Sequence, residues 1–254
     1  AVLTLALTLA LKIATLTFAV SEASRSKEGV FQSSRAPAPK IARLPIVSIM
    51  VPLFHEEDVA GHLIKRLSRL AYPKELIDVL LVVEVDDETT TQALARTKLP
   101  RWMRVVSVPR GGVKTKPRAL NYALDFCRGG IVGIWDAEDA PDPDQLYQVV
   151  RRFHERGPEV ACVQGILDFY NTRTNWLSRC FTIEYAGWFR VMLPGLQKLG
   201  LALPLGGTTV FFRRAALASL GGWAAHHGPA DAGLGLRLAR TGSRPAPVAT
   251  GTAA

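Results

Sequence analysis

Three acidic side chains follow a short apolar run near the middle of the chain, and their spacing could hold a metal ion. Asp136, Glu138 and Asp139 come after the run Ile131–Trp135, and prolines beyond them prevent the strand from continuing. Carboxylates this close repel one another unless a cation joins them. Oxygen ligands suit Mg²⁺ or Mn²⁺, ions that proteins often share with substrate phosphates. A solvated acidic turn would have the same pattern, so the spacing alone leaves both interpretations open.

An alternation of strands and helices predicts where these acids lie. Apolar runs typical of buried strands occupy residues 46–51, 77–85, 103–108, 131–135 and 160–165. Segments with helical spacing separate them at residues 56–70, 89–95, 116–126 and 144–153. This alternation predicts an α/β fold with a doubly wound, mostly parallel sheet flanked by helices. A second acidic pair, Asp86 and Asp87, ends the second strand, so both clusters can face one crevice at the carboxyl edge of the sheet.

The composition limits the partners that the chain can have. Its 254 residues carry a formal net charge of +9, and 48% of them are hydrophobic, which suffices for one large domain with a substantial core. The basic excess suits nucleic acid, an anionic membrane surface or an anionic substrate. Nucleic acid fits least, because no basic run is interleaved with aromatic residues. Cys127, Cys162 and Cys180 have no metal-ligand spacing and are predicted to be reduced core residues in a cytosolic compartment.

Four segments do not follow the alternation. Residues 1–20 are apolar apart from threonines and Lys12, and their length predicts a transmembrane helix, with a buried helix as the alternative. Residues 21–44 are basic and predict a juxtamembrane linker that places the next domain on the cytoplasmic side of an inner or plasma membrane. Residues 175–205 combine aromatic and basic side chains, which suits a helix in a membrane interface or one packed in the core. Residues 243–254 have no core-forming pattern and predict a disordered tail.

A series of short motifs occurs in an order that resembles the membrane-bound family 2 glycosyltransferases, inverting enzymes of the GT-A fold related to cellulose and hyaluronan synthases. The motifs are Val51–Glu57, Val83–Thr90, Lys116–Asn121, Asp136–Asp139, Val163–Leu167, Leu205–Arg214, Gly221–Trp223 and Asp231–Arg240. The resemblance implies a GT-A domain over residues 45–242. It implies that a sugar passes from a nucleotide-sugar, expected to be a UDP-sugar, to a hydroxyl acceptor such as a growing polysaccharide, with Mg²⁺ or Mn²⁺ as cofactor.

The resemblance also implies which residues hold the donor. Glu56, Asp86 and Asp87 resemble the acids that hold uridine, although ordinary turn acids would fit the same positions. Lys116 stands at the lysine that meets the diphosphate, at a helix start where an anion is also favoured.

The metal assignment follows from the same resemblance. Asp136 and Glu138 match the positions that hold the metal, and Asp139 is either a further ligand or a supporting group. The metal would neutralise the charge that builds on the departing nucleotide.

A general base is expected on the acceptor side. Single displacement needs a group that takes the proton of the acceptor hydroxyl. Asp231 falls on the aspartate of the family's T-E-D motif, so we expect it to be the base, and it could also cap the last helix. Pro229 and Ala230 replace the threonine and glutamate of that motif, and Gly233 replaces an acid that usually follows.

The remaining motif residues also belong to the acceptor side. Gly206, Gly207 and Thr208 match the acceptor-side loop, where glycine lets the backbone approach a sugar, although a bulge before a strand would also explain them. Trp223 could stack on a sugar ring or lie in the core. Gln164 matches a family motif, but its role does not follow from the sequence.

Three other functions remain open. The acceptor could be a lipid phosphate carrier or another lipid-linked group. The altered base region, together with the lack of the family's Q-x-x-R-W motif, also fits a nucleotide-sugar-binding remnant that binds without transfer. A structural module at a membrane surface would bind no nucleotide at all.

Overall fold

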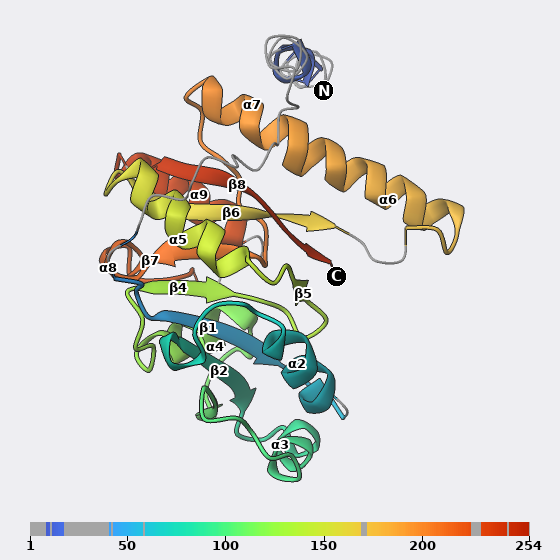
Figure 1. Ribbon diagram of the computed structural model, residues 1–254, viewed down its shortest axis with the longest axis vertical. Helices are drawn as coiled ribbons and strands as arrows, with labels where there is room; N and C mark the ends of the chain where they lie inside the picture. Colours follow the sequence, from blue (N-terminus) through green and yellow to red (C-terminus); the bar gives the residue numbers. More distant parts are fainter. Residues whose placement is uncertain are drawn as a thin grey trace.

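A mixed sheet forms the centre of the fold. The computed structural model describes residues 9–10, 12–17, 41, 43–57, 59–168, 172–224, 230–242 and 244–253. Within these residues the sheet has eight strands in the order β3-β2-β1-β4-β7-β6-β8-β5 (Figure 1). The strands are β1 (Val47–Leu53), β2 (Ile77–Glu84), β3 (Met103–Val108), β4 (Ile131–Ile134), β5 (Ala140–Pro141), β6 (Val160–Asp168), β7 (Val210–Arg213) and β8 (Arg244–Ala253).

Helices connect these strands. They are α2 (Val59–Ser68), α3 (Glu88–Ala95), α4 (Lys116–Leu124), α5 (Gln145–Arg156), α6 (Trp176–Gly187), α7 (Leu193–Lys198), α8 (Arg214–Ser219) and α9 (Ala230–Arg240). A short 3-10 turn, η1 (Lys74–Leu76), precedes β2, and a π-helical segment, η2 (Trp188–Met192), joins α6 to α7.

The strand directions bring several strand ends to one edge of the sheet. β1 is parallel to β2 and to β4, and β2 is parallel to β3. β7 is antiparallel to both β4 and β6, so β4 and β6 point the same way. The carboxyl ends of β1, β2, β4 and β6 therefore share one edge, and the acids that follow β2 and β4 lie there. This arrangement confirms the predicted α/β fold with a mostly parallel sheet.

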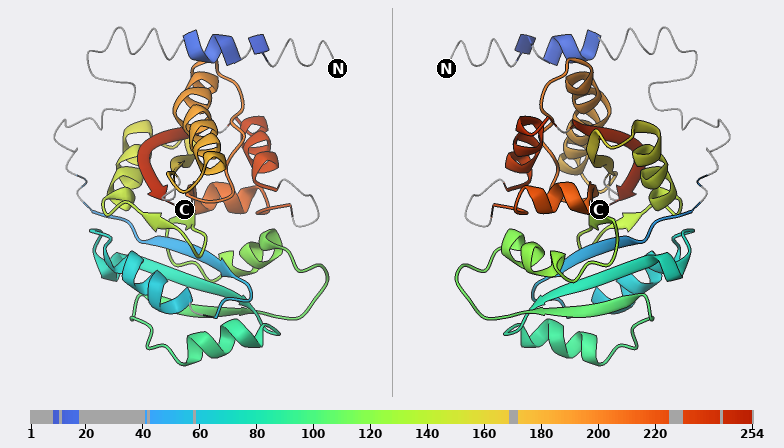
Figure 2. Two further views of the ribbon diagram at one scale, coloured as in Figure 1. Left: turned by 90° about the vertical axis from the view of Figure 1, so that its right-hand side faces the viewer. Right: turned by 90° about the vertical axis from the view of Figure 1, so that its left-hand side faces the viewer.

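Helices cover both faces of the sheet, because successive residues of a strand point to opposite sides. On one face, Ile49 of β1 belongs to a buried cluster that also contains residues of α2 and α5. On the other face, Met50 belongs to a second cluster with residues of α4 and α9. Figure 2 shows these helices on either side of the strands. Leu63 of α2 is fully buried in the first cluster, so its replacement by alanine should cost about 2–5 kcal/mol.

The prediction of a disordered tail is wrong for residues 244–253, which form β8. This strand pairs in parallel with β6 and, at Thr252 and Ala253, antiparallel with β5. Pro245 and Pro247 are tolerated because β5 does not reach them, so one edge of β8 needs no partner there. Composition alone missed the strand, because all of its pairing partners are residues more than 80 positions earlier in the chain.

The predicted transmembrane helix lies largely outside the described residues. Residues 9–10 and 12–17 are helical, whereas the other positions of the predicted span, and residues 21–40 of the predicted linker, are not described. Among the described helices, none combines the length and the apolar character that crossing a membrane requires. Thr15 is buried, and its hydroxyl contacts the sulfur of Met192 at 3.0 Å. Gly195 permits this approach, since a Cβ there would lie 2.6 Å from Thr15.

The aromatic segment predicted at residues 175–205 forms α6, η2 and α7, and its two halves differ in burial. η2 and α7 contribute Phe189, Leu193 and Leu196 to a third buried cluster beside the end of β6. No residue of α6 is buried. Cys180 on α6 is exposed, which corrects the prediction that all three cysteines lie in the core.

Candidate active site

A crevice opens at the shared edge of the sheet, where the topology predicts a ligand site. Its volume is about 300 Å³. The end of β1, the end of β2, the start of α4 and the end of β4 line it with Pro52, Leu53, Phe54, Val82, Glu84, Lys114, Thr115, Lys116, Ala119 and Asp136. The crevice therefore combines an apolar floor with two lysines and two carboxylates.

Lys116 and Asp136 form an ion pair at the centre of this edge. The Lys116 ammonium lies 2.5 Å from Oδ1 of Asp136 and donates a second hydrogen bond to the carbonyl of Gly207 at 2.9 Å. Both side chains are about one-third exposed. Thr115 caps α4 by accepting the N–H of Arg118, which fixes Lys116 at the first position of the helix. The predicted diphosphate lysine and the predicted metal-binding aspartate are thus neighbours, together with the predicted acceptor loop.

Asp139 is the buried carboxylate of the acidic turn, residues 136–139. Its Oδ2 accepts the N–H of Asp136 at 2.8 Å and the hydroxyl of Thr208. The side chain is 1% exposed, and its Oδ1 has no hydrogen-bond partner among the described residues. Burial, offset in part by these hydrogen bonds, raises the pKa of Asp139 to about 7. Asp139 therefore ties the acidic turn to the loop before β7, a position that fits a supporting group rather than a direct ligand.

Asp136 and Glu138 remain as candidate metal ligands. Asp136 borders the crevice, and Glu138 is exposed on the same turn, whose backbone is held by a 2.6 Å hydrogen bond from Arg66 to the Glu138 carbonyl. Among the described residues, no three His, Cys, Asp or Glu side chains converge on a point that could hold a metal. Mg²⁺ is commonly held by one or two carboxylates together with substrate phosphates. The turn therefore fits a metal that is shared with a diphosphate.

Asp87 has a structural role at the predicted uridine side. Its carboxylate accepts the backbone N–H of His55 at 2.8 Å and both the N–H and the hydroxyl of Thr90, so it caps α3. Burial alone would raise the pKa of Asp87, but these hydrogen bonds hold it below its ordinary value. The N–H of Glu56 donates to the same Thr90 hydroxyl at 2.9 Å. Asp87 therefore fixes the loop that follows β1, including the half-buried Glu56.

The neighbouring acids pair with basic residues that the sequence did not single out. Oδ2 of Asp86 lies 2.5 Å from the Lys114 ammonium, and this hydrogen bond lowers the pKa of Asp86. Glu84 accepts two hydrogen bonds from Arg118, at 3.0 and 3.1 Å. The sequence could have indicated the pair of Glu84 and Arg118, because Glu84 ends a predicted strand and Arg118 lies in the first turn of a later helix.

Gln164 positions the predicted acceptor loop. The buried amide accepts the N–H of Gly206 at 2.9 Å and donates to the carbonyls of Thr208 and Thr209, both at 3.2 Å. Thr209 has a φ of 52°, a left-handed conformation that is rare for a β-branched residue. The amide therefore holds a strained loop beside Lys116, which is the role that the sequence did not reveal.

The two remaining predicted residues differ in outcome. Trp223 is 2% exposed and packs edge-on against Phe212, with ring centroids 5.8 Å apart, so it is a core residue and not a sugar-stacking one. Asp231 is the second residue of α9, and its side chain lies outside the described residues. Its role as general base stays a prediction.

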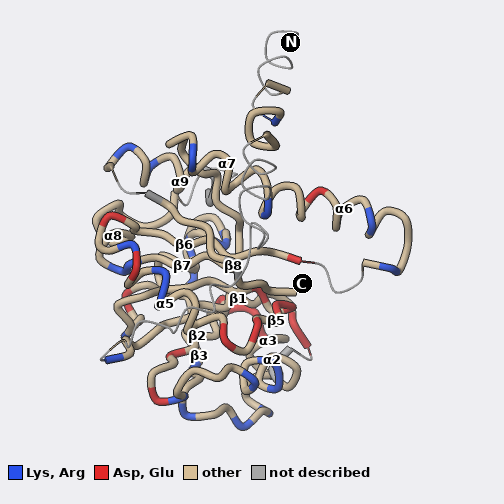
Figure 3. Tube along the Cα trace, turned by 45° about the horizontal axis from the view of Figure 1, so that its top comes forward, with Lys and Arg blue, Asp and Glu red and all other residues tan. Residues whose placement is uncertain are grey.

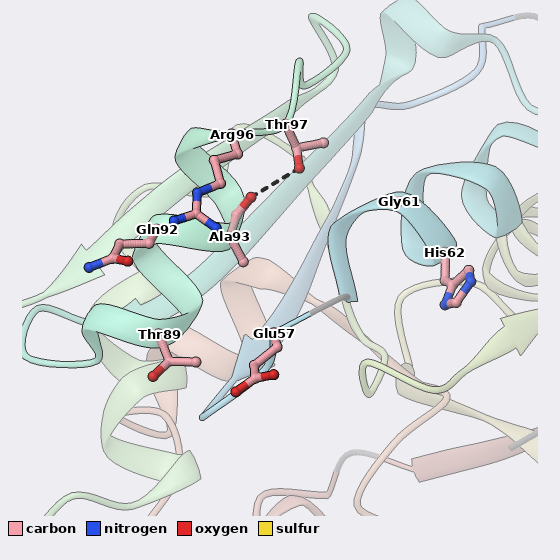
Figure 4. A pocket seen from close by; sticks show the side chains of 8 residues that line it. All are labelled: Glu57, Gly61, His62, Thr89, Gln92, Ala93, Arg96 and Thr97. Atoms are coloured by element: carbon pink, nitrogen blue, oxygen red, sulfur yellow. Dashed lines mark hydrogen bonds between the residues drawn. The ribbon is translucent and has the colours of Figure 1, made fainter.

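A second pocket, of about 830 Å³, lies between α2 and α3. Figure 4 shows His62 of α2 on one wall and Gln92 and Arg96 on the other. The full lining is Glu57, Gly61, His62, Thr89, Gln92, Ala93, Arg96 and Thr97. This pocket is larger than the crevice, but it contains none of the residues that the sequence assigns to the donor, the metal or the acceptor. We therefore place the candidate site in the crevice.

Comparisons with known proteins point to one family. A family model described as "Glycosyltransferase like family 2" matches residues 45–252. The beta-monoglucosyldiacylglycerol synthase of Nostoc sp. is 31% identical over 183 residues, which make up 71% of this chain but 38% of that protein. The chain thus spans well under half of the length of this relative.

Solved structures share the fold. A mannosyltransferase from Pyrobaculum calidifontis, in complex with GDP-Man and Mn²⁺, is 24% identical with a TM-score of 0.64, over 96% of this chain and 64% of that one. TarS from S. aureus, in complex with UDP-GlcNAc, is 20% identical with a TM-score of 0.58, over 82% of this chain and 58% of that one. At these identities the likeness concerns the fold alone.

Proposed function

The chain belongs to glycosyltransferase family 2, and from that premise we propose that its crevice binds a UDP-sugar with Mg²⁺ or Mn²⁺ and transfers the sugar, with inversion, to a hydroxyl acceptor. The observation that carries the proposal is the pair of Lys116 and Asp136 at the carboxyl edge of the sheet, 2.5 Å apart. The ammonium that would meet the diphosphate and the carboxylate that would hold its metal lie there next to a helix N-terminus and a glycine-containing loop.

Each group has a task in this proposal. The Lys116 ammonium and the N-terminus of α4 would receive the diphosphate, since both favour an anion. Asp136 and Glu138 would hold the metal, which would act as a Lewis acid toward the departing nucleotide. Asp231, in the first turn of α9, would take the proton of the acceptor hydroxyl.

Two classes of acceptor deserve testing. A growing polysaccharide follows from the resemblance to cellulose and hyaluronan synthases. A lipid hydroxyl is favoured by a different observation, because the Nostoc relative is named as a synthase of glucosyldiacylglycerol. The basic excess of residues 21–44 favours a domain at the cytoplasmic face of a membrane for either acceptor.

The test is nucleotide release from a panel of UDP-sugars with Mn²⁺ or Mg²⁺, measured in detergent beside direct UDP binding on the same sample. Metal-dependent release from one sugar, with diacylglycerol, glucosyldiacylglycerol or an oligosaccharide as acceptor, is expected. UDP binding without nucleotide release, for every donor and acceptor tried, would favour a chain that binds nucleotide-sugars without transferring the sugar. A folded sample that binds no UDP would refute the proposal.

A further inference from the structure

Helix α6 extends away from the core and exposes a row of large apolar side chains. Trp176 is 74% exposed and Ile183 is 73% exposed, and with Cys180 they recur at the i, i+4, i+7 spacing of one helix face. Leu177, on the adjoining face, is 50% exposed. Figure 1 shows α6 reaching past the strands, while α7 lies over the body of the molecule. A helix face with this much exposed apolar surface normally marks a contact surface.

A second apolar row lies at the same end of the molecule. Leu9, Ile13 and Leu16 have the same i, i+4, i+7 spacing, and each is more than half exposed. The buried Thr15 holds residues 12–17 against Met192 and Gly195, which continue the helical segment that begins with α6 (Figure 2). The N-terminal row therefore contacts the η2 and α7 end of this helical segment, whereas the exposed row of α6 lies toward its other end.

Basic side chains accompany these rows. Arg173 and Arg179 are exposed at the outer end of α6, and Lys12 is exposed on the N-terminal segment. α6 carries Arg179 and one acid, Glu184, and Figure 3 shows basic positions both on α6 and on the loop before it. Tryptophan and aliphatic side chains next to arginine and lysine are the combination with which helices lie in the headgroup region of anionic bilayers.

We propose that α6, together with the N-terminal row at the α7 end of the same helical segment, lies in the surface of an anionic lipid bilayer. The fold brings the chain into this surface from the edge of the sheet at which the crevice opens. β6 points in the same direction as β4, so the chain leaves β6 at the edge where Asp136 lies. Two hydrogen bonds, at 2.8 and 2.5 Å, join Arg190 of η2 to Asp168 at the end of β6 and fix the helical segment there.

Bilayer contact through α6 deepens the proposed function and rests on it. This surface is the one from which a lipid or membrane-held acceptor would reach the crevice. Bilayer contact is measured without turnover. It can therefore fail while UDP binding persists, and UDP binding can fail while bilayer contact persists.

The test uses the exposed Cys180 as the site of an environment-sensitive fluorophore. Cys127 and Cys162 are buried, and burial raises the pKa of both thiols, so they should react far more slowly. The labelled full chain is mixed with phosphatidylglycerol/phosphatidylcholine vesicles that carry a nitroxide in the upper acyl chain. The matched control carries Cys180→Ser and the label at Val105→Cys, on β3, far along the sheet from β6.

We expect vesicles to raise the emission of the α6 label severalfold, and the acyl nitroxide to quench it, while the β3 label changes little. In a Trp176→Glu/Ile183→Glu variant whose melting temperature matches that of the wild type, half-maximal signal should need at least tenfold more lipid. The proposal is overturned if the α6 label stays in water while the protein floats with the vesicles, because another segment then makes the contact. It is equally overturned if light scattering shows a dimer that shields the label without lipid and dissociates in the double variant.

Discussion

Replacing Gln164 with leucine should destabilise the loop that carries the acceptor-side glycines. Leucine is similar in size but cannot accept the N–H of Gly206 or donate to the carbonyl of Thr208. The carbonyl of Thr209 keeps a partner, since it also accepts the N–H of Gly165 at 2.8 Å. The amide also donates to the carbonyl of Gly165 at 3.1 Å, so three further backbone groups lose the hydrogen bond that the amide makes to them.

The size of the effect follows from burial. An unsatisfied buried polar group costs about 1–3 kcal/mol, but Gly206 is only half-buried and the bonds to the carbonyls of Gly165 and Thr208 are long, at 3.1 and 3.2 Å, so these groups together should cost about 2–4 kcal/mol. For a chain of this length, about 2–4 °C of melting temperature is lost per kcal/mol, which predicts a decrease of roughly 5–15 °C. The strained Thr209 would then relax, and the carbonyl of Gly207 would move away from Lys116.

The assay is thermal unfolding, followed by sugar transfer and UDP binding on the same variant. Gln148→Leu is the matched control, because the amide of Gln148 bonds only to the exposed Asp144 among the described residues. The control should stay within about 0.5 kcal/mol of the wild type. Transfer by Gln164→Leu should fall more than UDP binding does. A melting temperature within 1–2 °C of the wild type, roughly the spread expected of a surface change, would refute the reasoning.

Three further predictions concern the donor, the base and acid stability. Lys116→Met should weaken UDP binding about 10- to 100-fold in calorimetry, the equivalent of one charge-assisted hydrogen bond, and a loss below twofold would contradict its role. Asp231→Asn should abolish transfer while UDP still binds, so retained turnover would place the base elsewhere. Asp78 is fully buried, and although burial would raise its pKa, hydrogen bonds from Arg104, Ser48 and Arg128 hold it below the ordinary value. The stability that Asp78 contributes is therefore present above the unfolded pKa of about 3.9 and is lost as the pH falls further. The free energy of unfolding, measured with urea between pH 7 and 2.5, should fall less steeply with decreasing pH for Asp78→Asn than for the wild type. Equal slopes would argue against this.

The sequence predicted the part of the fold that local patterns determine. Continuous apolar runs identified β1, β2, β3, β4 and β6, and acids after β2 and β4 located the crevice, because strand ends of a parallel sheet share an edge. β8 was missed, since its pairing depends on distant residues and its prolines are tolerated only where β5 ends. Long-range pairing of this kind leaves little trace in composition.

The sequence predicted which residues belong to the candidate site better than it predicted the contacts that these residues make. The Lys116–Asp136 pair brings together two positions that the sequence had assigned separately to the diphosphate and the metal. The inward orientation of Asp139 was not predictable, because D-A-E-D spacing does not tell which carboxylate faces the turn and which faces solvent. The amide of Gln164 was likewise unassigned, since its partners lie some 40 residues later in the chain.

The central claim is that Asp136 holds a metal shared with the diphosphate of a UDP-sugar. Calorimetric titration of UDP into wild type and Asp136→Ala, with and without Mn²⁺, tests it most directly. We predict that Mn²⁺ tightens UDP binding to the wild type at least tenfold and leaves the affinity of a folded Asp136→Ala unchanged. The same Mn²⁺-dependent gain in the folded variant would contradict the account.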